Sequence, residues 1–171
     1  MEPPLKGIAT PYNAALHKFA VVLACWTFLL IIAGALVTSN DAGLSVPDWP
    51  TSFGSLYKIP HMVGGVRFEH SHRMIAQMAG LLTIVLAIWT WRADKRRWMK
   101  YLGVGALGTV IAQGVLGGLT VLFYLPAPIS SAHAALAQTP LDSLQHEAEL
   151  ALIRRLAEMA PMRAIPAEAA E

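Results

Sequence analysis

The chain has 171 residues, of which 55% are apolar and only 14% charged, and its formal net charge is +2. A water-soluble domain of this length could not bury so much apolar surface, whereas a lipid bilayer solvates it. The small net charge, with no basic residues interleaved with aromatic ones on polar segments, excludes a nucleic-acid-binding protein. The composition therefore predicts an integral membrane protein whose main surroundings are the lipid bilayer.

The single cysteine, Cys25, lies inside an apolar run. It excludes an intramolecular disulfide and a multi-cysteine metal site. We expect it to be a small buried side chain in a membrane helix. No zinc, phosphate-loop or nucleophile–base signature stands out elsewhere in the chain.

Three uncharged apolar runs are long enough to cross a membrane, namely residues 19–37, 74–91 and 101–125. At 1.5 Å per residue, about 20 helical residues cross a hydrocarbon core of roughly 30 Å. Backbone groups inside lipid must be satisfied within the segment, so these runs are predicted to be helices. The first run is too long for a signal-peptide core and no clear cleavage site follows it, so we expect a retained signal anchor.

Basic residues near the helix ends predict the orientation. Residues 92–100, between the second and third runs, hold five Lys or Arg, which favours the cytoplasmic side. The loop 38–68 and the turn 126–129 are then expected on the outer side.

The fourth apolar segment, residues 129–138, has about half the length that a span needs. Thr139, Pro140 and Asp142 then resemble the start of a new helix, and its apolar residues fall on one stripe. The stripe comprises Leu141, Leu144, Ala148, Leu152, Leu156 and Met159. We therefore predict an all-α membrane bundle of three full transmembrane helices and a truncated fourth in residues 1–138, and a surface amphipathic helix with a disordered tail in residues 139–171.

Residues 67–73 open the second span with a cluster of ionisable side chains. Such groups are costly in a bilayer and are functional candidates by default. Glu69 and His72 are three residues apart and share a helix face, whereas His70 and Arg73 point elsewhere. Arg67 and Arg73 are equally well explained as anchors to lipid phosphates. The Glu69–His72 pair is less readily explained by anchoring alone.

His133 lies among small apolar residues, where a lone histidine is more often structural. However, His72 and His133 each lie a few residues from the outer end of a helix, so we expect their imidazoles at the same depth in the membrane. Imidazole is an axial ligand for heme iron, and helix bundles hold porphyrins between facing helices. The pair predicts a heme site.

The third span carries six glycines: Gly103, Gly105, Gly108, Gly114, Gly117 and Gly118. We favour close helix packing as their role, with room for a flat macrocycle as the alternative. The outer loop 41–50 is interpreted as turns around an interfacial tryptophan.

These segments in this order resemble the heme A synthase family. The matching stretches are GALVTS (34–39), AGL (42–44), PDWP (47–50), EHSHR (69–73), QGVLGGLTV (113–121) and SAHAALAQ (131–138). Members of that family oxidise a methyl group of heme O to the formyl group of heme A, for cytochrome oxidase. The resemblance implies eight transmembrane helices in two similar halves, the N-terminal half handling the substrate heme and the C-terminal half a heme b.

By position, the resemblance implies that His72 and His133 are the histidine pair that ligates the heme iron in the substrate half. Glu69 corresponds to the essential carboxylate, which could stabilise positive charge at the oxidised carbon or accept a proton. Arg67 and Arg73 could bind heme propionates. The resemblance also implies a multi-pass protein of the bacterial inner membrane.

The chain departs from the family pattern in two ways. The first outer loop lacks the cysteine pair of many bacterial members, and the fourth helix breaks off after Gln138 with no second half following. Three hypotheses stay open: a half-size oxidoreductase completed by homo-oligomerisation, a heme-binding module or subunit whose partner chain supplies the missing helices, and an inactive truncated fragment.

Overall fold

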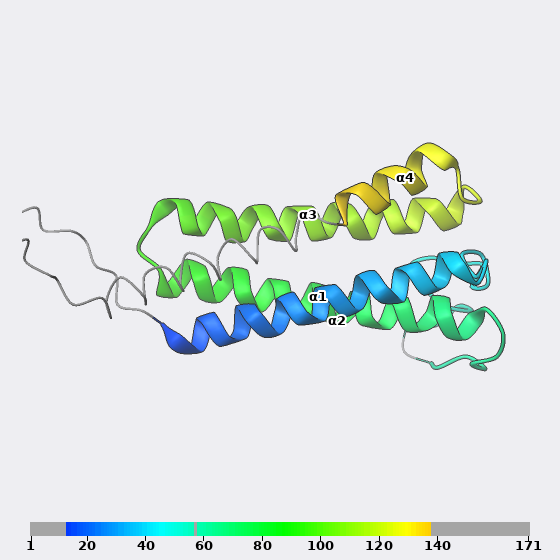
Figure 1. The fold of residues 1–171 in the computed structure, drawn as a ribbon, viewed down its shortest axis with the longest axis horizontal. Coiled ribbons are helices and arrows are strands. Elements are labelled where there is room, and N and C mark those ends of the chain that lie inside the picture. Colours follow the sequence, from blue (N-terminus) through cyan, green and yellow to red (C-terminus); the bar gives the residue numbers. More distant parts are fainter. Residues whose placement is uncertain (1–12, 57, 138–171) are drawn as a thin grey trace, which may run out of the picture.

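The computed structural model describes residues 13–56 and 58–137, and it contains four helices and no strand within them. The helices are α1 (Ala14–Ser39), α2 (Val66–Ala93), α3 (Arg97–Leu122) and α4 (Ala127–Leu136). Each packs on the next in chain order, so α1 contacts α2, α2 contacts α3 and α3 contacts α4 (Figure 1). The predicted all-α architecture is confirmed over these residues.

The α1–α2 interface holds most of the core. Leu23 and Leu86 are almost fully buried there with Ala20, and the indole of Trp26 donates a 3.0 Å hydrogen bond to the backbone oxygen of Ile75. The hydroxyl of Thr27 bonds to the carbonyl four residues earlier, which satisfies a polar group in an apolar setting. The two helices are therefore held in a fixed register.

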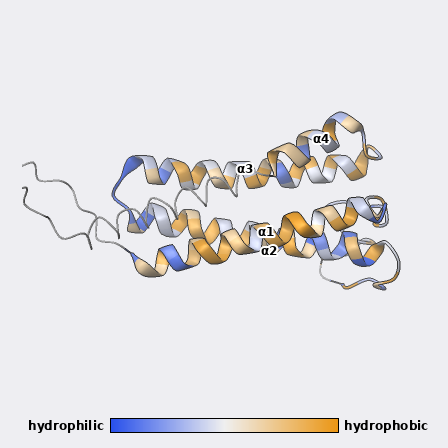
Figure 2. Cartoon of the chain, viewed as in Figure 1, coloured by the Kyte–Doolittle hydropathy of each residue, from blue (hydrophilic) through white to orange (hydrophobic). Residues whose placement is uncertain are grey.

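The outward surfaces of the first three helices are apolar. Phe28, Leu81 and Ile111 are each more than half exposed, which would be unfavourable in water but is expected in lipid. Figure 2 shows hydrophobic colour along the helices and hydrophilic colour toward their ends. Among the described residues, three helices are long and apolar enough to cross a membrane, as predicted, and the chain is a multi-pass membrane protein.

The ends of the helices do not coincide with the ends of the apolar runs in the sequence. α2 begins at Val66, so the polar cluster 67–73 forms its first two turns. α3 ends at Leu122 rather than at Leu125, because Tyr124 and Leu125 adopt left-handed backbone angles. The N–H of Leu125 then donates to the carbonyl of Thr120 at 2.7 Å and closes the helix end.

α4 begins at Ala127, inside the segment expected to be a turn, because Pro128 suits the first turn of a helix. The described part of α4 has ten residues, and the predicted truncation of this helix stays a prediction. The predicted amphipathic helix and tail, residues 139–171, lie outside the described residues. Cys25 is exposed on α1 and not buried as expected, since its side of the helix does not face α2.

The loop between α1 and α2 folds over the ends of the helices. Val46 is fully buried, and Gly43 lies so close to Leu125 that an added methyl group would be 3.2 Å from it. The ring of Trp49 lies against Gly118 of α3. The expected interfacial tryptophan therefore joins this loop to α3.

Asp48 organises that loop. Its carboxylate accepts hydrogen bonds from the hydroxyl of Thr51 and from the backbone N–H groups of Phe53 and Gly54. Burial alone would raise the pKa of Asp48, but these hydrogen bonds outweigh it and hold the pKa below its usual 3.8. The carboxylate is therefore a structural acceptor that is turned inward to its own loop.

Candidate functional site

His72 of α2 lies against Gly34 of α1. A methyl group at Gly34 would be only 3.1 Å from Cε1 of His72, so the absence of a side chain there makes room for the ring. The imidazole also interacts with the backbone of Leu30, four residues before Gly34. A glycine in a helix leaves the preceding turn's carbonyl open to a neighbouring side chain, and that is how α1 accommodates the ring.

His133 of α4 repeats this arrangement on α3. A methyl group at Gly117 would lie 3.2 Å from Cε1 of His133, and the ring interacts with the backbone of Gln113, again four residues before the glycine. In each of the helix pairs α1–α2 and α3–α4, a glycine of the first helix thus makes room for an imidazole of the second. The two pairs are alike in this local respect.

The two imidazoles are near enough for electrostatic interaction. Nδ1 is buried in both rings, although neither contact with the neighbouring backbone has the geometry of a full hydrogen bond. Nε2 is not buried in this way and makes no hydrogen bond to the described residues, so it is the nitrogen available to a ligand. The structure therefore brings together the two predicted histidines, from two different helices.

Glu69 lies one turn outward from His72 and is 4% exposed. One carboxylate oxygen accepts a 2.8 Å hydrogen bond from the N–H of Val46, and the other pairs with the guanidinium of Arg73 at 2.6 Å. A guanidinium and a backbone N–H group therefore hold this buried carboxylate in place.

Arg73 holds the outer loop to α2. Its two terminal nitrogens donate to the carbonyls of Asp48, Thr51 and Val46 at 2.6, 2.9 and 3.1 Å, as well as to Glu69. Arg67, by contrast, is exposed and stacks over the ring of Phe68 at 4.7 Å. The expectation that Arg73 points away from Glu69 is therefore wrong, because residues four apart on a helix lie on one face and form an ion pair here. The two arginines have different surroundings.

His70 points away from His72, as expected, but it is 7% exposed and its Nδ1 lies 3.2 Å from the hydroxyl of Ser52. Sequence reasoning assigned no role to Gly34 or to the buried side-chain oxygens of Gln113 and Ser130, which have no hydrogen-bond partner among the residues that the structure describes. Gln113 lies one turn before Gly117 and Ser130 one turn before His133. That spacing was the available signal.

Comparison with known proteins decides the family. The profile of the COX15-CtaA family, described as cytochrome oxidase assembly protein, matches residues 65–158. The chain belongs to this family. The match includes Glu69, His72 and His133 and extends past Gln138, the predicted boundary between the two parts of the chain; that boundary stays a prediction.

Individual relatives agree with the COX15-CtaA assignment. The chain is 37% identical to the heme A synthase of Lysinibacillus sphaericus over 115 residues, which are 66% of this chain and 37% of that protein. It is 32% identical to that of Bacillus licheniformis over 71% of this chain and 40% of the relative, and 30% identical to that of Halalkalibacterium halodurans over 77% and 45%. The chain therefore spans less than half the length of the relatives it matches.

The residues present suit a heme. Two imidazoles from separate helices interact electrostatically, and each lies against a glycine where an added methyl group would crowd the ring. The side-chain oxygens of Gln113 and Ser130 lie on the same helices as Gly117 and His133, and neither has a hydrogen-bond partner within the described part of the chain. Axial ligation needs only two such nitrogens.

Proposed function

We propose that this chain binds a heme through His72 and His133 and takes part in oxidising a methyl group of heme O to the formyl group of heme A. The observation that carries the proposal is the repeated histidine–glycine arrangement on the two helix pairs. Support comes from the COX15-CtaA profile match and from relatives named heme A synthase.

The backbone contact of each ring favours one tautomer. Nδ1 is the buried nitrogen of each ring, so Nε2 is the nitrogen that would bind the iron. Such a second contact orients a metal-ligating imidazole and raises its basicity. We infer that Leu30 and Gln113 supply this contact through their backbones.

The bound heme would supply the iron that activates the oxidant and the methyl group that is oxidised. Glu69 would act beside it as a fixed negative charge, because Arg73 and the N–H of Val46 hold its carboxylate in place. A carboxylate in that position stabilises positive charge at the reacting carbon or accepts the proton that leaves it. Arg73 would position Glu69, and the exposed guanidinium of Arg67 would bind a propionate.

We also propose that the protein lies in the bacterial inner membrane with residues 92–100 in the cytoplasm, and that a second copy or a partner chain contributes further helices. Lys95 is exposed in the basic loop, so a Lys95→Cys variant in a Cys25→Ser background reports its side. We expect an impermeant maleimide added from outside to leave the introduced thiol unlabelled. Rapid labelling in intact cells would reverse the orientation.

The proposed activity is tested by expressing the chain in a bacterial host that makes heme O but no heme A, and by separating extracted hemes by chromatography and mass spectrometry. We expect heme A with the wild type and none with the His72→Ala/His133→Ala double variant. Bound heme without conversion would establish a heme-binding module instead. Absence of bound heme would contradict the proposal as a whole.

A further inference from the structure

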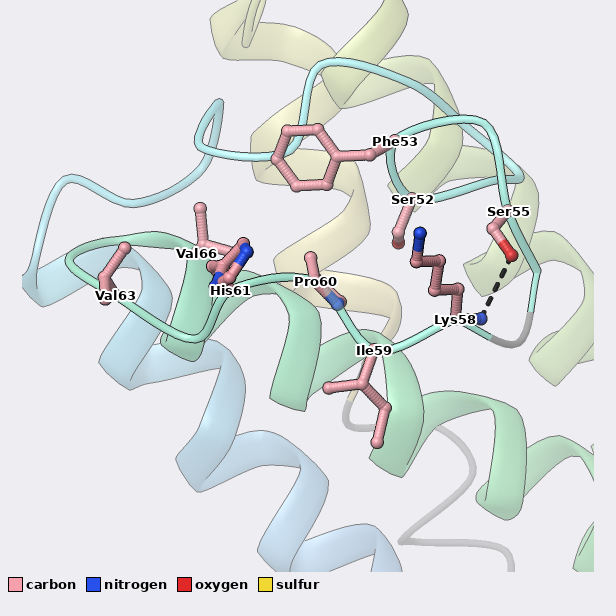
Figure 3. A pocket seen from close by; sticks show the side chains of 9 residues that line it. All are labelled: Ser52, Phe53, Ser55, Lys58, Ile59, Pro60, His61, Val63 and Val66. Atoms are coloured by element: carbon pink, nitrogen blue, oxygen red, sulfur yellow. Dashed lines mark hydrogen bonds between the residues drawn. The ribbon is translucent and has the colours of Figure 1, made fainter.

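A cleft of about 470 Å³ lies in the outer loop beside the first turn of α2, and none of its lining residues belongs to the proposed heme site. Figure 3 shows its lining, which comprises Ser52, Phe53, Ser55, Lys58, Ile59, Pro60, His61, Val63 and Val66. The cleft has the size of a site for a lipid head group or a small molecule.

One part of the cleft is polar and favours an anion. The side-chain nitrogen of Lys58 is turned toward Ser52, with His61 farther along the wall (Figure 3). No carboxylate lines the cleft, and Lys58 forms no ion pair with the residues that the structure describes. The nearby carboxylate of Asp48 is occupied by hydrogen bonds of its own loop. An ammonium group beside hydroxyls binds a phosphate well.

The other part of the cleft is apolar and exposed. Phe53 is 53% exposed, and Ile59 and Val63 are each 69% exposed. This loop lies where α1 ends and α2 begins, and both helices are long enough to span a membrane. Where a membrane-spanning helix ends at the surface of the bilayer, exposed apolar side chains contact acyl chains, and a neighbouring lysine reaches the lipid head groups.

The walls of the cleft are fixed to the helices. Ser52 is buried, pairs with Ser55 through backbone hydrogen bonds of 2.8 and 3.3 Å, and has its hydroxyl 3.2 Å from Nδ1 of His70 on α2. The hydroxyl of Ser55 accepts a 3.0 Å hydrogen bond from the N–H of Lys58. The cleft is therefore preformed, which lowers the entropic cost of binding.

We propose that this cleft binds the head group of an anionic phospholipid from the adjacent leaflet. The phosphate contacts Lys58, His61 and the serine hydroxyls, and the acyl chains run along Ile59 and Val63. The lipid bilayer would supply this ligand directly, because the cleft lies next to the ends of two helices that are long enough to span it. A zwitterionic lipid binds less well, since no carboxylate in the cleft pairs with a choline group.

Native mass spectrometry of the full chain in detergent tests this proposal, with phosphatidylglycerol and phosphatidylcholine supplied together. We expect wild-type protein to retain phosphatidylglycerol preferentially. Lys58→Gln should reduce the bound phosphatidylglycerol roughly fivefold, the effect of one lysine at an anionic surface, and adding His61→Gln should reduce it further. Lys95→Gln removes the same charge from the basic loop at the other end of α2, outside the cleft, and should reduce retention clearly less than Lys58→Gln does.

A second experiment distinguishes binding of a lipid from binding of a free anion. Ile59→Ser with Val63→Ser should weaken retention of long-chain phosphatidylglycerol but leave binding of inorganic phosphate as it was. Equal retention of the two lipids, or equal losses in Lys58→Gln and Lys95→Gln, would overturn the proposal. Binding of inorganic phosphate alone, with no lipid retained, would also overturn it.

Discussion

The imidazole of His72 lies against Gly34, at a point of α1 where an added methyl group would come within 3.1 Å of the ring. His133 and Gly117 stand in the same relationship, at 3.2 Å. Because real Cβ atoms rarely come so close, any side chain at either glycine must push the ring outward. The position of each proposed ligand thus depends on a glycine of the neighbouring helix.

Gly34→Ala and Gly117→Ala should each weaken heme retention. The added methyl group displaces the imidazole and separates it from the backbone of Leu30 or Gln113. Loss of such a second contact weakens metal binding by roughly tenfold or more. The measurement is heme content per protein after purification. Gly114→Ala is the matched control, since a methyl group there meets nothing within 4 Å; equal heme loss in the control would contradict the argument.

Glu69→Gln should retain heme but abolish methyl oxidation. The amide keeps the shape of the side chain and loses the charge that faces the reacting carbon in our proposal. It also weakens the charge-assisted bond to Arg73, which contributes about 1.5–3 kcal/mol. Heme content, heme A formation and melting temperature should be measured together. Wild-type yields of heme A in Glu69→Gln would show that the carboxylate only holds the loop.

Gly118→Ala should destabilise the protein by about 1–3 kcal/mol, the usual cost of overpacking. Its methyl group would overlap the ring of Trp49, so the ring must leave α3. Trp49→Leu should remove most of that penalty in the double variant, which a double-mutant cycle detects as strong coupling. Gly108→Ala, with open space around it, is the control. Additive effects of Gly118→Ala and Trp49→Leu would contradict this contact.

Asp48 should stabilise the outer loop in a pH-dependent way. Its pKa is lowered in the folded protein, so the stabilisation is complete above the usual pKa of 3.8 and is lost as the pH falls through the lowered value. The difference in melting temperature between wild type and Asp48→Asn should therefore be constant from about pH 7 to pH 5 and shrink below about pH 4. A difference in melting temperature that grows as the pH falls would contradict this role of Asp48.

The transmembrane helices could be predicted from the sequence because lipid imposes a length and a composition on each span. Their ends could not, because they depend on turns. The left-handed pair Tyr124 and Leu125 ends α3 three residues before the apolar run does. The cluster 67–73 is helical although it is polar, because backbone groups of the outer loop form hydrogen bonds with the side chains of Glu69 and Arg73.

The candidate site was predictable in its residue types and only partly in its contacts. The depth of His72 and His133, with the family resemblance, selected the two imidazoles. Their packing against Gly34 and Gly117 depends on the register between neighbouring helices, and no short pattern in a single sequence predicts that register. The glycines of α3 divide accordingly: Gly103, Gly117 and Gly118 contact other side chains, whereas a methyl group at Gly105, Gly108 or Gly114 would meet nothing described.

The axial ligation of the heme tests the central claim most directly. Low-temperature electron paramagnetic resonance of the purified ferric protein should show a low-spin, bis-imidazole iron in the wild type. His72→Ala and His133→Ala should each give a high-spin signal or lose the heme. His70→Ala should keep the low-spin signal at reduced stability, because it removes the contact with Ser52 and no proposed iron ligand. His17→Ala, at the far end of α1, should also keep the low-spin signal. A low-spin signal that survives in both His72→Ala and His133→Ala would contradict the claim that these two residues bind the iron.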